Sequence, residues 1–143
     1  MKRLIALLII LLPLTAVAQT TTFEDLASEY SLKENCTTIK ISNAMLRSME
    51  INIDAEYMRV IAVEDEDLIP IFSRQAKEII CQHDIIMSVN ADGKCVEIYQ
   101  HKNSDNVVTE IYVLAYDKKE AVLMYVNGKN LELSNMGSII SQF

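Results

Sequence analysis

The sequence predicts an α+β domain, with a mainly antiparallel sheet and helices packed on one face of it. Amphipathic helical patterns cluster before residue 82, whereas residues 84–126 read as a succession of strands joined by short turns. Helices and strands that are segregated along the chain favour α+β over an alternating α/β fold. No repeat, low-complexity tract or flexible linker interrupts residues 19–143, so we expect them to form a single α+β domain.

The N-terminus has the organisation of a signal peptide. Two basic residues are followed by an unbroken apolar run, Leu4–Leu12, and Ala16–Ala18 supplies the small residues of a cleavage site before Gln19. The apolar run is shorter than the roughly 20 residues that a membrane-spanning helix needs. We therefore expect residues 1–18 to be removed, and the product to be periplasmic or secreted without a stable membrane anchor.

Short helices and short strands alternate at the start of the domain. Thr22 is placed to cap a helix, and Asp25 completes a capping box three residues later. Residues 37–42 alternate as a strand, and Ser42 is placed to cap a short helix over residues 43–49. The apolar side of the first helix consists of Phe23, Leu26, Ala27 and Tyr30, and that of the second of Met45, Leu46 and Met49.

A second strand and a longer helix follow. Residues 57–63 are mostly apolar or β-branched, as in a strand that is covered on much of both faces. Asp67 is predicted to cap the next helix, because this places Pro70 in the first turn, where a missing N–H is harmless. The helix is expected to end near Cys81. A strand–helix–strand crossover in this half of the chain would add one parallel pair to the sheet.

The second half of the chain predicts a meander of four strands. Asp92-Gly93 is typical of the tight turn of a hairpin, and Asn127-Gly128 is predicted to be a further turn. A last helix is expected after these strands. The four strands are expected over residues 84–90, 95–101, 109–117 and 121–126. The last helix is expected to begin at Ser134, with Met136, Ile139, Ile140 and Phe143 on its apolar side.

The acidic composition argues against two classes of partner. The whole chain has a net charge of −7, which becomes more negative when the basic residues of the signal are removed. Such a charge repels phosphate backbones and anionic lipid headgroups. We therefore expect no nucleic-acid partner and no lipid-surface partner.

The three cysteines, Cys36, Cys81 and Cys95, leave the disulfide state open. An oxidising compartment permits one bridge and leaves one thiol over, and spacing alone does not choose the pair. Three cysteines are too few for a disulfide scaffold. We expect no obligatory bridge, with the thiols acting as small apolar residues.

No residue pattern predicts catalysis, a cofactor or a metal site. Cys81 and His83 are close in sequence, and Cys95 and His101 share one face of a predicted strand, but the paired spacings of a zinc site are missing. His83 is instead expected to interact with the last carbonyl groups of the preceding helix. The acidic run Glu64–Asp67 lacks the spacing and the glycine of a calcium loop. No nucleophile elbow or Ser/His/Asp set is recognisable, so we expect a protein that is not an enzyme.

Two stretches, IKISNAMLRSM at residues 39–49 and VNGKNLELSNMGSII at residues 126–140, resemble a family of short exported Bacteroidetes proteins. The family is domain of unknown function 4252. The resemblance implies an exported α+β domain, and it implies no catalytic residues. The positions that carry it are Phe23, Leu26, Tyr30, Ile39, Ile41, Ala44, Met45, Leu46, Met49, Gly128, Leu131, Glu132 and Leu133.

Export, a single domain and the lack of a catalytic set lead to one main interpretation. The protein would be a small non-enzymatic module that binds a protein partner in the cell envelope or senses the state of the envelope. The alternative is a carrier that holds a small apolar ligand between sheet and helices. A cavity lined by Met45, Met49, Leu123 and Met124 would favour the carrier, and a packed core with an exposed apolar patch would favour the interaction module. The sequence leaves the oligomeric state open.

Overall fold

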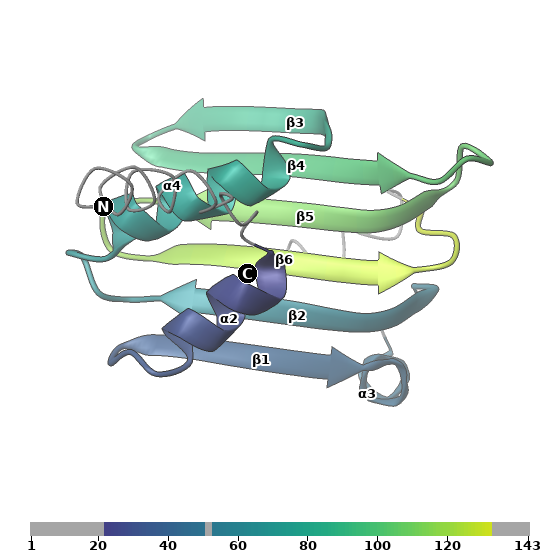
Figure 1. The fold of residues 1–143 in the computed structure, drawn as a ribbon, viewed down its shortest axis with the longest axis horizontal. Helices are drawn as coiled ribbons and strands as arrows, with labels where there is room; N and C mark the ends of the chain where they lie inside the picture. Colours follow the sequence, from purple (N-terminus) through teal and green to yellow (C-terminus); the bar gives the residue numbers. More distant parts are fainter. Residues whose placement is uncertain (1–21, 51–52, 133–143) are drawn as a thin grey trace, which may run out of the picture.

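A computed structural model describes residues 22–50 and 53–132 and confirms the α+β class. Helices α2 and α4 lie across one face of a six-stranded sheet, and α3 lies at one end of it (Figure 1). The helices are α2 (Phe23–Tyr30), α3 (Asn43–Ser48) and α4 (Ile69–Ile80). The strands are β1 (Cys36–Ser42), β2 (Ala55–Val63), β3 (Asp84–Ala91), β4 (Lys94–Lys102), β5 (Val108–Tyr116) and β6 (Ala121–Gly128).

The strands follow the order β1-β2-β6-β5-β4-β3, and every neighbouring pair is antiparallel. The predicted meander of β3 to β6 is confirmed. Pairing of β2 with β6 joins it to the N-terminal hairpin, with Met58 opposite Val126. The prediction of a parallel pair of strands is wrong. Because α3 is only 6 residues long, the chain reverses at the end of β1 and returns beside it instead of crossing the sheet.

Helices α2 and α4 bury their apolar sides on one face of the sheet (Figure 1). The predicted capping box is present, since Thr22 Oγ1 accepts from the backbone N–H of Asp25 and the Asp25 carboxylate accepts from that of Thr22. The Tyr30 ring meets the Phe72 ring of α4 edge-on, with centroids 4.9 Å apart. The predicted stripe of Phe23, Leu26, Ala27 and Tyr30 is fully buried, as are Phe72, Ala76 and Ile79 of α4.

A second apolar cluster lies on the opposite face of the sheet. The strand residues that point away from α2 and α4, such as Val60, Met124 and Val113, are each less than 10% exposed. Leu46 of α3 and Leu131 extend this cluster at one end. Ser42 caps α3 as predicted, because its hydroxyl accepts from the backbone N–H of Met45 at 3.3 Å. The sheet is therefore packed with apolar side chains on both faces.

Two predicted helix features differ from the structure. Asp67 does not cap α4. The helix begins at Ile69 after a turn in which Asp65 accepts from the backbone N–H of Asp67, because a short carboxylate side chain stabilises such a turn locally. Pro70 does lie in the first helical turn, as expected. In α3, Leu46 is buried but Met45 and Met49 are 55% and 48% exposed, since so short a helix covers the sheet with one side chain.

The predicted turn at Asn127-Gly128 is also wrong, because both residues continue β6. Asn127 lies opposite Glu110 on one side, and Gly128 lies opposite Ala55 on the other. Pairing with two strands outweighs the local turn preference of this dipeptide. The signal peptide over residues 1–18 and the helix expected from Ser134 lie outside the described residues. Among the described residues, no helix has the length and apolarity to cross a membrane.

Candidate functional site

A polar row crosses the helix-bearing face of the sheet near the ends of its strands. Asn127 of β6 lies opposite Glu110 of β5, and Glu110 lies opposite His101 of β4. The next row on this face is aromatic, with Tyr125 of β6 opposite Tyr112 of β5, and both tyrosines belong to the helix-side core. Because side chains two apart on a strand share a face, the register places all five side chains on the same side of the sheet.

His83 joins this row from the segment between α4 and β3. Its backbone N–H donates to the carbonyl of Ile80 at 3.0 Å. Its imidazole stacks on the Tyr112 ring, with centroids 4.8 Å apart and planes at 19°, and meets the His101 ring edge-on at 5.5 Å. The expected interaction with the end of α4 is thus made by the backbone of His83, and the prediction is wrong for its side chain.

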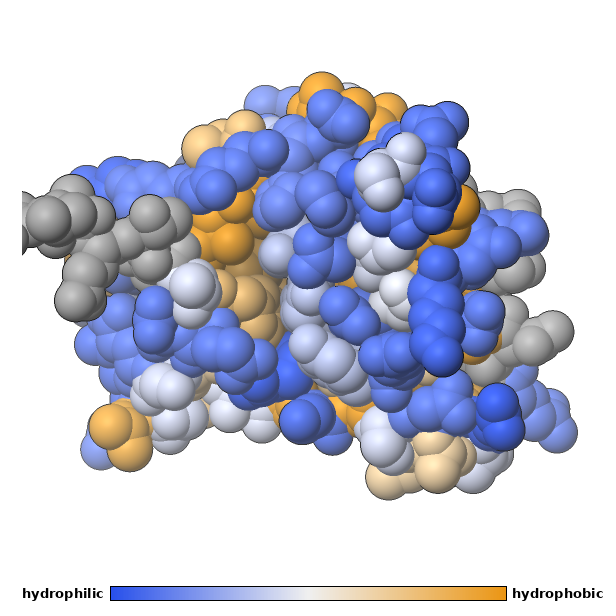
Figure 2. Space-filling view, turned by 45° about the vertical axis from the view of Figure 1, so that its right-hand side comes forward, coloured by the Kyte–Doolittle hydropathy of each residue, from blue (hydrophilic) through white to orange (hydrophobic). Residues whose placement is uncertain are grey.

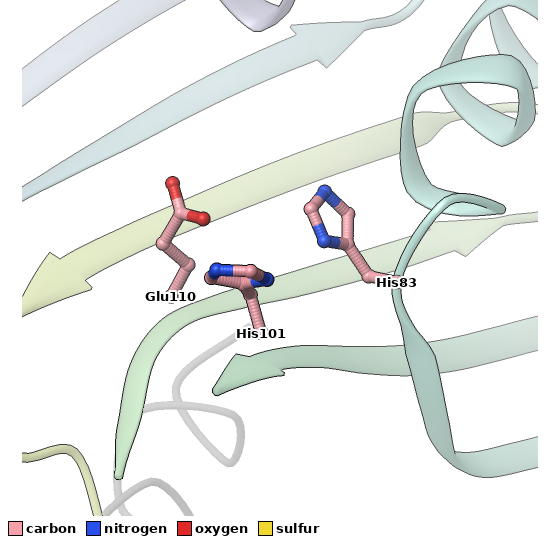
Figure 3. Close-up of side chains that lie close together, drawn as sticks. All are labelled: His83, His101 and Glu110. Atoms are coloured by element: carbon pink, nitrogen blue, oxygen red, sulfur yellow. The ribbon is translucent and has the colours of Figure 1, made fainter. Parts of the chain in front are cut away.

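His83, His101 and Glu110 form a cluster of three potential metal ligands, which we call the His-His-Glu cluster. One ligand atom of each lies within 4.8 Å of the other two, and the three side chains lie together on one side of the sheet (Figure 3). His83 and Glu110 are half-buried, and His101 is exposed. Two imidazoles and a carboxylate are donors that suit zinc and other first-row divalent ions.

The carboxylate of Glu110 is oriented by hydrogen bonds from β6. The Tyr125 hydroxyl donates to Oε1 of Glu110, and the Asn127 amide donates to the Tyr125 hydroxyl at 3.0 Å. Burial raises the pKa of the Tyr125 hydroxyl, and its bond to Glu110 raises it further. Tyr125 is therefore a protonated donor at neutral pH, and it fixes the position of the carboxylate.

The imidazole of His83 has an unsatisfied nitrogen. Its Nδ1 atom is buried and finds no hydrogen-bond partner among the described residues. Burial lowers the pKa of the His83 imidazole and His101 lowers it further, against the opposing carboxylates of Glu110 and Asp84. The ring is therefore mainly neutral near pH 7. A neutral imidazole is the form that binds a metal ion.

The three cysteines lie away from the His-His-Glu cluster. Cys95 shares the helix-bearing face of β4 with His101, but six residues of strand separate them by about 20 Å. Cys81 at the end of α4 is exposed, and its thiol donates to the carbonyl of Glu78. Cys36 lies at the start of β1, on the far side of the sheet order. None of the three thiols belongs to the cluster, and no disulfide joins them in the structure.

Sequence reasoning missed Glu110. His101 lies in the second predicted strand of the meander and Glu110 in the third, so the two residues belong to one predicted hairpin. A regular hairpin with these strand ends would place His101 opposite Thr109, whereas the observed pairing of β4 with β5 places it opposite Glu110. The bulge between His101 and Lys102 makes this one-residue shift, and sequence reasoning did not predict it.

A second feature is the outer edge of β3, which forms one end of the sheet. All 8 residues of β3 are exposed, and among the described residues the strand pairs only with β4. Four of its side chains are large and apolar: Ile85, Ile86, Met87 and Val89. Hydrophobic side chains reach the surface at the upper edge of the molecule, the edge that β3 forms in Figure 1 (Figure 2). The opposite edge strand, β1, instead carries Lys40 and a pair of threonines.

A groove of about 1000 Å³ runs beside α4, open to solvent. Its lining combines apolar Ile69 and Pro70 with charged side chains of both signs, including Arg74, Lys77 and Glu78. The ammonium group of Lys77 donates to the Tyr116 hydroxyl at 2.8 Å, which closes one side of the groove. A ligand here would therefore meet a mainly apolar surface with charged groups of both signs around it.

The comparisons with known proteins give one match. No curated protein and no solved structure matches the chain. The model of the family described as a domain of unknown function, DUF4252, matches residues 30–139. This range includes every strand of the sheet and all of α3 and α4. The chain belongs to the DUF4252 family.

Proposed function

We propose that this protein is an exported, non-enzymatic module that binds a protein partner through the outer edge of β3. The partner contributes an extended segment that adds a seventh strand to the sheet. One observation carries the proposal: an edge strand of 8 residues is exposed along its whole length and carries four large exposed apolar side chains. Export itself is proposed from the basic start, apolar run and cleavage pattern of residues 1–18.

The edge of β3 has the properties that favour strand addition. A strand edge offers a row of backbone N–H and C=O groups to a second strand. Natural proteins usually protect such an edge with lysine, proline or a covering segment. Residues 84–91 contain neither lysine nor proline. Met87 and Val89 point to the face opposite α2 and α4, whereas Ile85 points to the helix-bearing face, so an added strand gains apolar contact on both faces.

Charge favours a different protein over a second copy of this chain as the occupant. Asp84 and Asp92 bound β3, and no basic residue lies between them. In a two-fold antiparallel pairing of β3 with itself, the carboxylates at the two ends would approach each other, in a chain whose net charge is already −7. The segment that fits is apolar in the middle with a lysine or arginine at each end.

The binding experiment uses capture from a cell-envelope extract, with two matched variants. Met87→Lys places a charge on the edge of β3, and Ile71→Lys places the same charge at an exposed apolar position of α4. We expect capture of a specific protein by the wild type and by Ile71→Lys, and its loss in Met87→Lys. Hydrogen exchange of the purified complex should show protection of the backbone amides of residues 84–91.

Three outcomes would overturn the proposal. Capture that survives Met87→Lys places the binding surface elsewhere, and unchanged exchange at residues 84–91 rules out strand addition. Sedimentation of the wild type as a dimer and of Met87→Lys as a monomer makes a second copy the occupant. Circular dichroism of both variants separates these results from misfolding.

The carrier alternative has weaker support. Met45 and Met49 are exposed, Leu123 lies in the helix-side core, and Met124 lies in the core of the opposite face. These four side chains therefore do not line one cavity. The groove beside α4 is one remaining candidate for a small ligand, but it is open to solvent and does not enclose an apolar molecule between sheet and helices.

A further inference from the structure

We infer that His83, His101 and Glu110 form a binding site for a first-row divalent metal ion, with Zn²⁺ as the representative ion. The sequence alone predicted no metal site, because no two of these residues have a metal-ligand spacing. The fold brings them together from the α4–β3 segment, β4 and β5. The inference is independent of the proposed partner, since it does not involve the outer edge of β3.

The number and type of donors fit one class of ion. Two imidazole nitrogens and one carboxylate oxygen form a common three-ligand set for zinc, in which a fourth position is left to water or another ligand. Calcium and magnesium prefer oxygen ligands only and a higher coordination number. The cluster therefore selects a borderline ion such as Zn²⁺, Co²⁺ or Ni²⁺ over Ca²⁺ and Mg²⁺.

The geometry requires only a small contraction. With metal–nitrogen distances of about 2.1 Å, tetrahedral ligand atoms are about 3.4 Å apart. The three ligand atoms here lie within 4.8 Å of one another. His101 is exposed and opposite Glu110 on the neighbouring strand, so rotation of its side chain can close this difference without a change in the sheet. A ring nitrogen of His83 faces His101 (Figure 3).

Neighbouring side chains hold two of the three ligands, His83 and Glu110, in position. Stacking on Tyr112 holds the His83 ring in place, and its buried Nδ1 has no hydrogen-bond partner among the described residues. Such an atom is unfavourable unless a ligand satisfies it. The Tyr125 hydroxyl holds Glu110, and Asn127 in turn holds Tyr125. Groups that orient ligands in this way are typical of metal sites.

The test is calorimetric titration of the purified, metal-free protein with Zn²⁺. We expect one ion per chain, and a tetrahedral absorption spectrum when Co²⁺ replaces Zn²⁺. Loss of a group that orients a ligand costs about 10-fold in metal affinity, so Tyr125→Phe should weaken Zn²⁺ binding by about that factor. His101→Asn and Glu110→Gln, which each remove a ligand, should weaken binding further. His101 is exposed, so His101→Asn is expected to fold normally.

Cys81→Ser is the matched control, because Cys81 is the nearest thiol in sequence to His83 and is exposed. Zn²⁺ affinity should be unchanged in this variant. Loss of Zn²⁺ binding in Cys81→Ser would show that the Cys81 thiol is a ligand, and it would overturn the inference. The inference also fails if the wild type shows no saturable binding of Zn²⁺, or if His101→Asn and Glu110→Gln bind as tightly as the wild type. Circular dichroism of each variant identifies any loss that comes from unfolding.

Discussion

Gly128, at the end of β6, is expected to tolerate no side chain. It lies opposite Ala55 of β2, where the register of the β2–β6 pair shifts between Ala55 and Tyr57. A Cβ atom built on Gly128 would overlap the backbone carbonyl of Asp54, lie 2.7 Å from Cδ2 of Leu131 and lie 3.2 Å from Cα of Ala55. Gly128→Ala therefore forces the end of β6 away from β2.

The loss of stability in Gly128→Ala depends on which of the contacting atoms can move. The Leu131 side chain can rotate, but the Asp54 carbonyl belongs to the backbone that leads into β2. Overpacking a buried site by a methyl group typically costs 1–3 kcal/mol, and a clash with backbone belongs at the upper end, about 3 kcal/mol. Gly93→Ala is the matched substitution. Gly93 has φ +78° and no atom near its Cβ position, so its expected cost of about 1 kcal/mol comes from backbone conformation alone.

Equilibrium unfolding in urea, followed by circular dichroism, measures both variants against the wild type. Leu131→Ala is combined with Gly128→Ala to separate the two clashes. Because the carbonyl clash remains, the double variant should not recover the stability that Gly128→Ala loses. The reasoning is refuted if Gly128→Ala is as stable as Gly93→Ala, or if removal of the Leu131 side chain restores the stability of Gly128→Ala.

Four further outcomes are expected. Ser42→Ala should lower the free energy of unfolding by about 1 kcal/mol through loss of the cap on α3, and an unchanged urea midpoint would contradict this assignment. Burial raises the pKa of Tyr30 from 10.0 to about 12, so Tyr30 loses its phenolic proton in the unfolded chain before it does so in the folded protein. The free energy of unfolding should therefore fall as the pH rises from 10 to about 12. In alkaline unfolding experiments, Tyr30→Phe should show a shallower fall. Thiol titration of the unfolded oxidised protein should find three thiols, and its melting temperature should not depend on reductant; one thiol and a lower midpoint on reduction would mean a structural disulfide. N-terminal sequencing of exported material should begin at Gln19, and an intact Met1 on membrane-associated protein would disprove signal cleavage.

The sequence predicts most of the local structure, because local structure depends on neighbours along the chain. Thr22 and Ser42 cap helices through backbone groups three residues away. The Asp92-Gly93 turn follows from the preference of these residues for positive φ, and both have it, at 55° and 78°. The cap predicted at Asp67 failed within the same short range, since the backbone N–H of Ile69 donates to the backbone carbonyl of Asp65 and Pro70 has no N–H to donate.

Features that depend on segments distant in sequence are harder to predict from the sequence. The apolar pattern of β3 is that of a buried strand, yet its place at the end of the sheet leaves Ile85 and Met87 at the surface. A buried central strand and an exposed edge strand differ in their place in the strand order, and the periodicity of the sequence does not reveal that order. His83 meets Glu110 for a similar reason, because the end of α4 and the β4–β5 pair are brought together by tertiary packing rather than by spacing.

The place of β2 in the sheet constrains the order in which the chain can fold. The pairs β3–β4, β4–β5 and β5–β6 each join strands that are consecutive in sequence, so they close short loops and form early. The β2–β6 pair brings Val63 opposite Ala121 and closes the longest loop between neighbouring strands. A nascent chain that ends before residue 121 therefore holds the β1–β2 hairpin with one unpaired edge of Met58, Val60 and Ile61. Until β6 pairs with β2, this edge stays open to pairing with other chains.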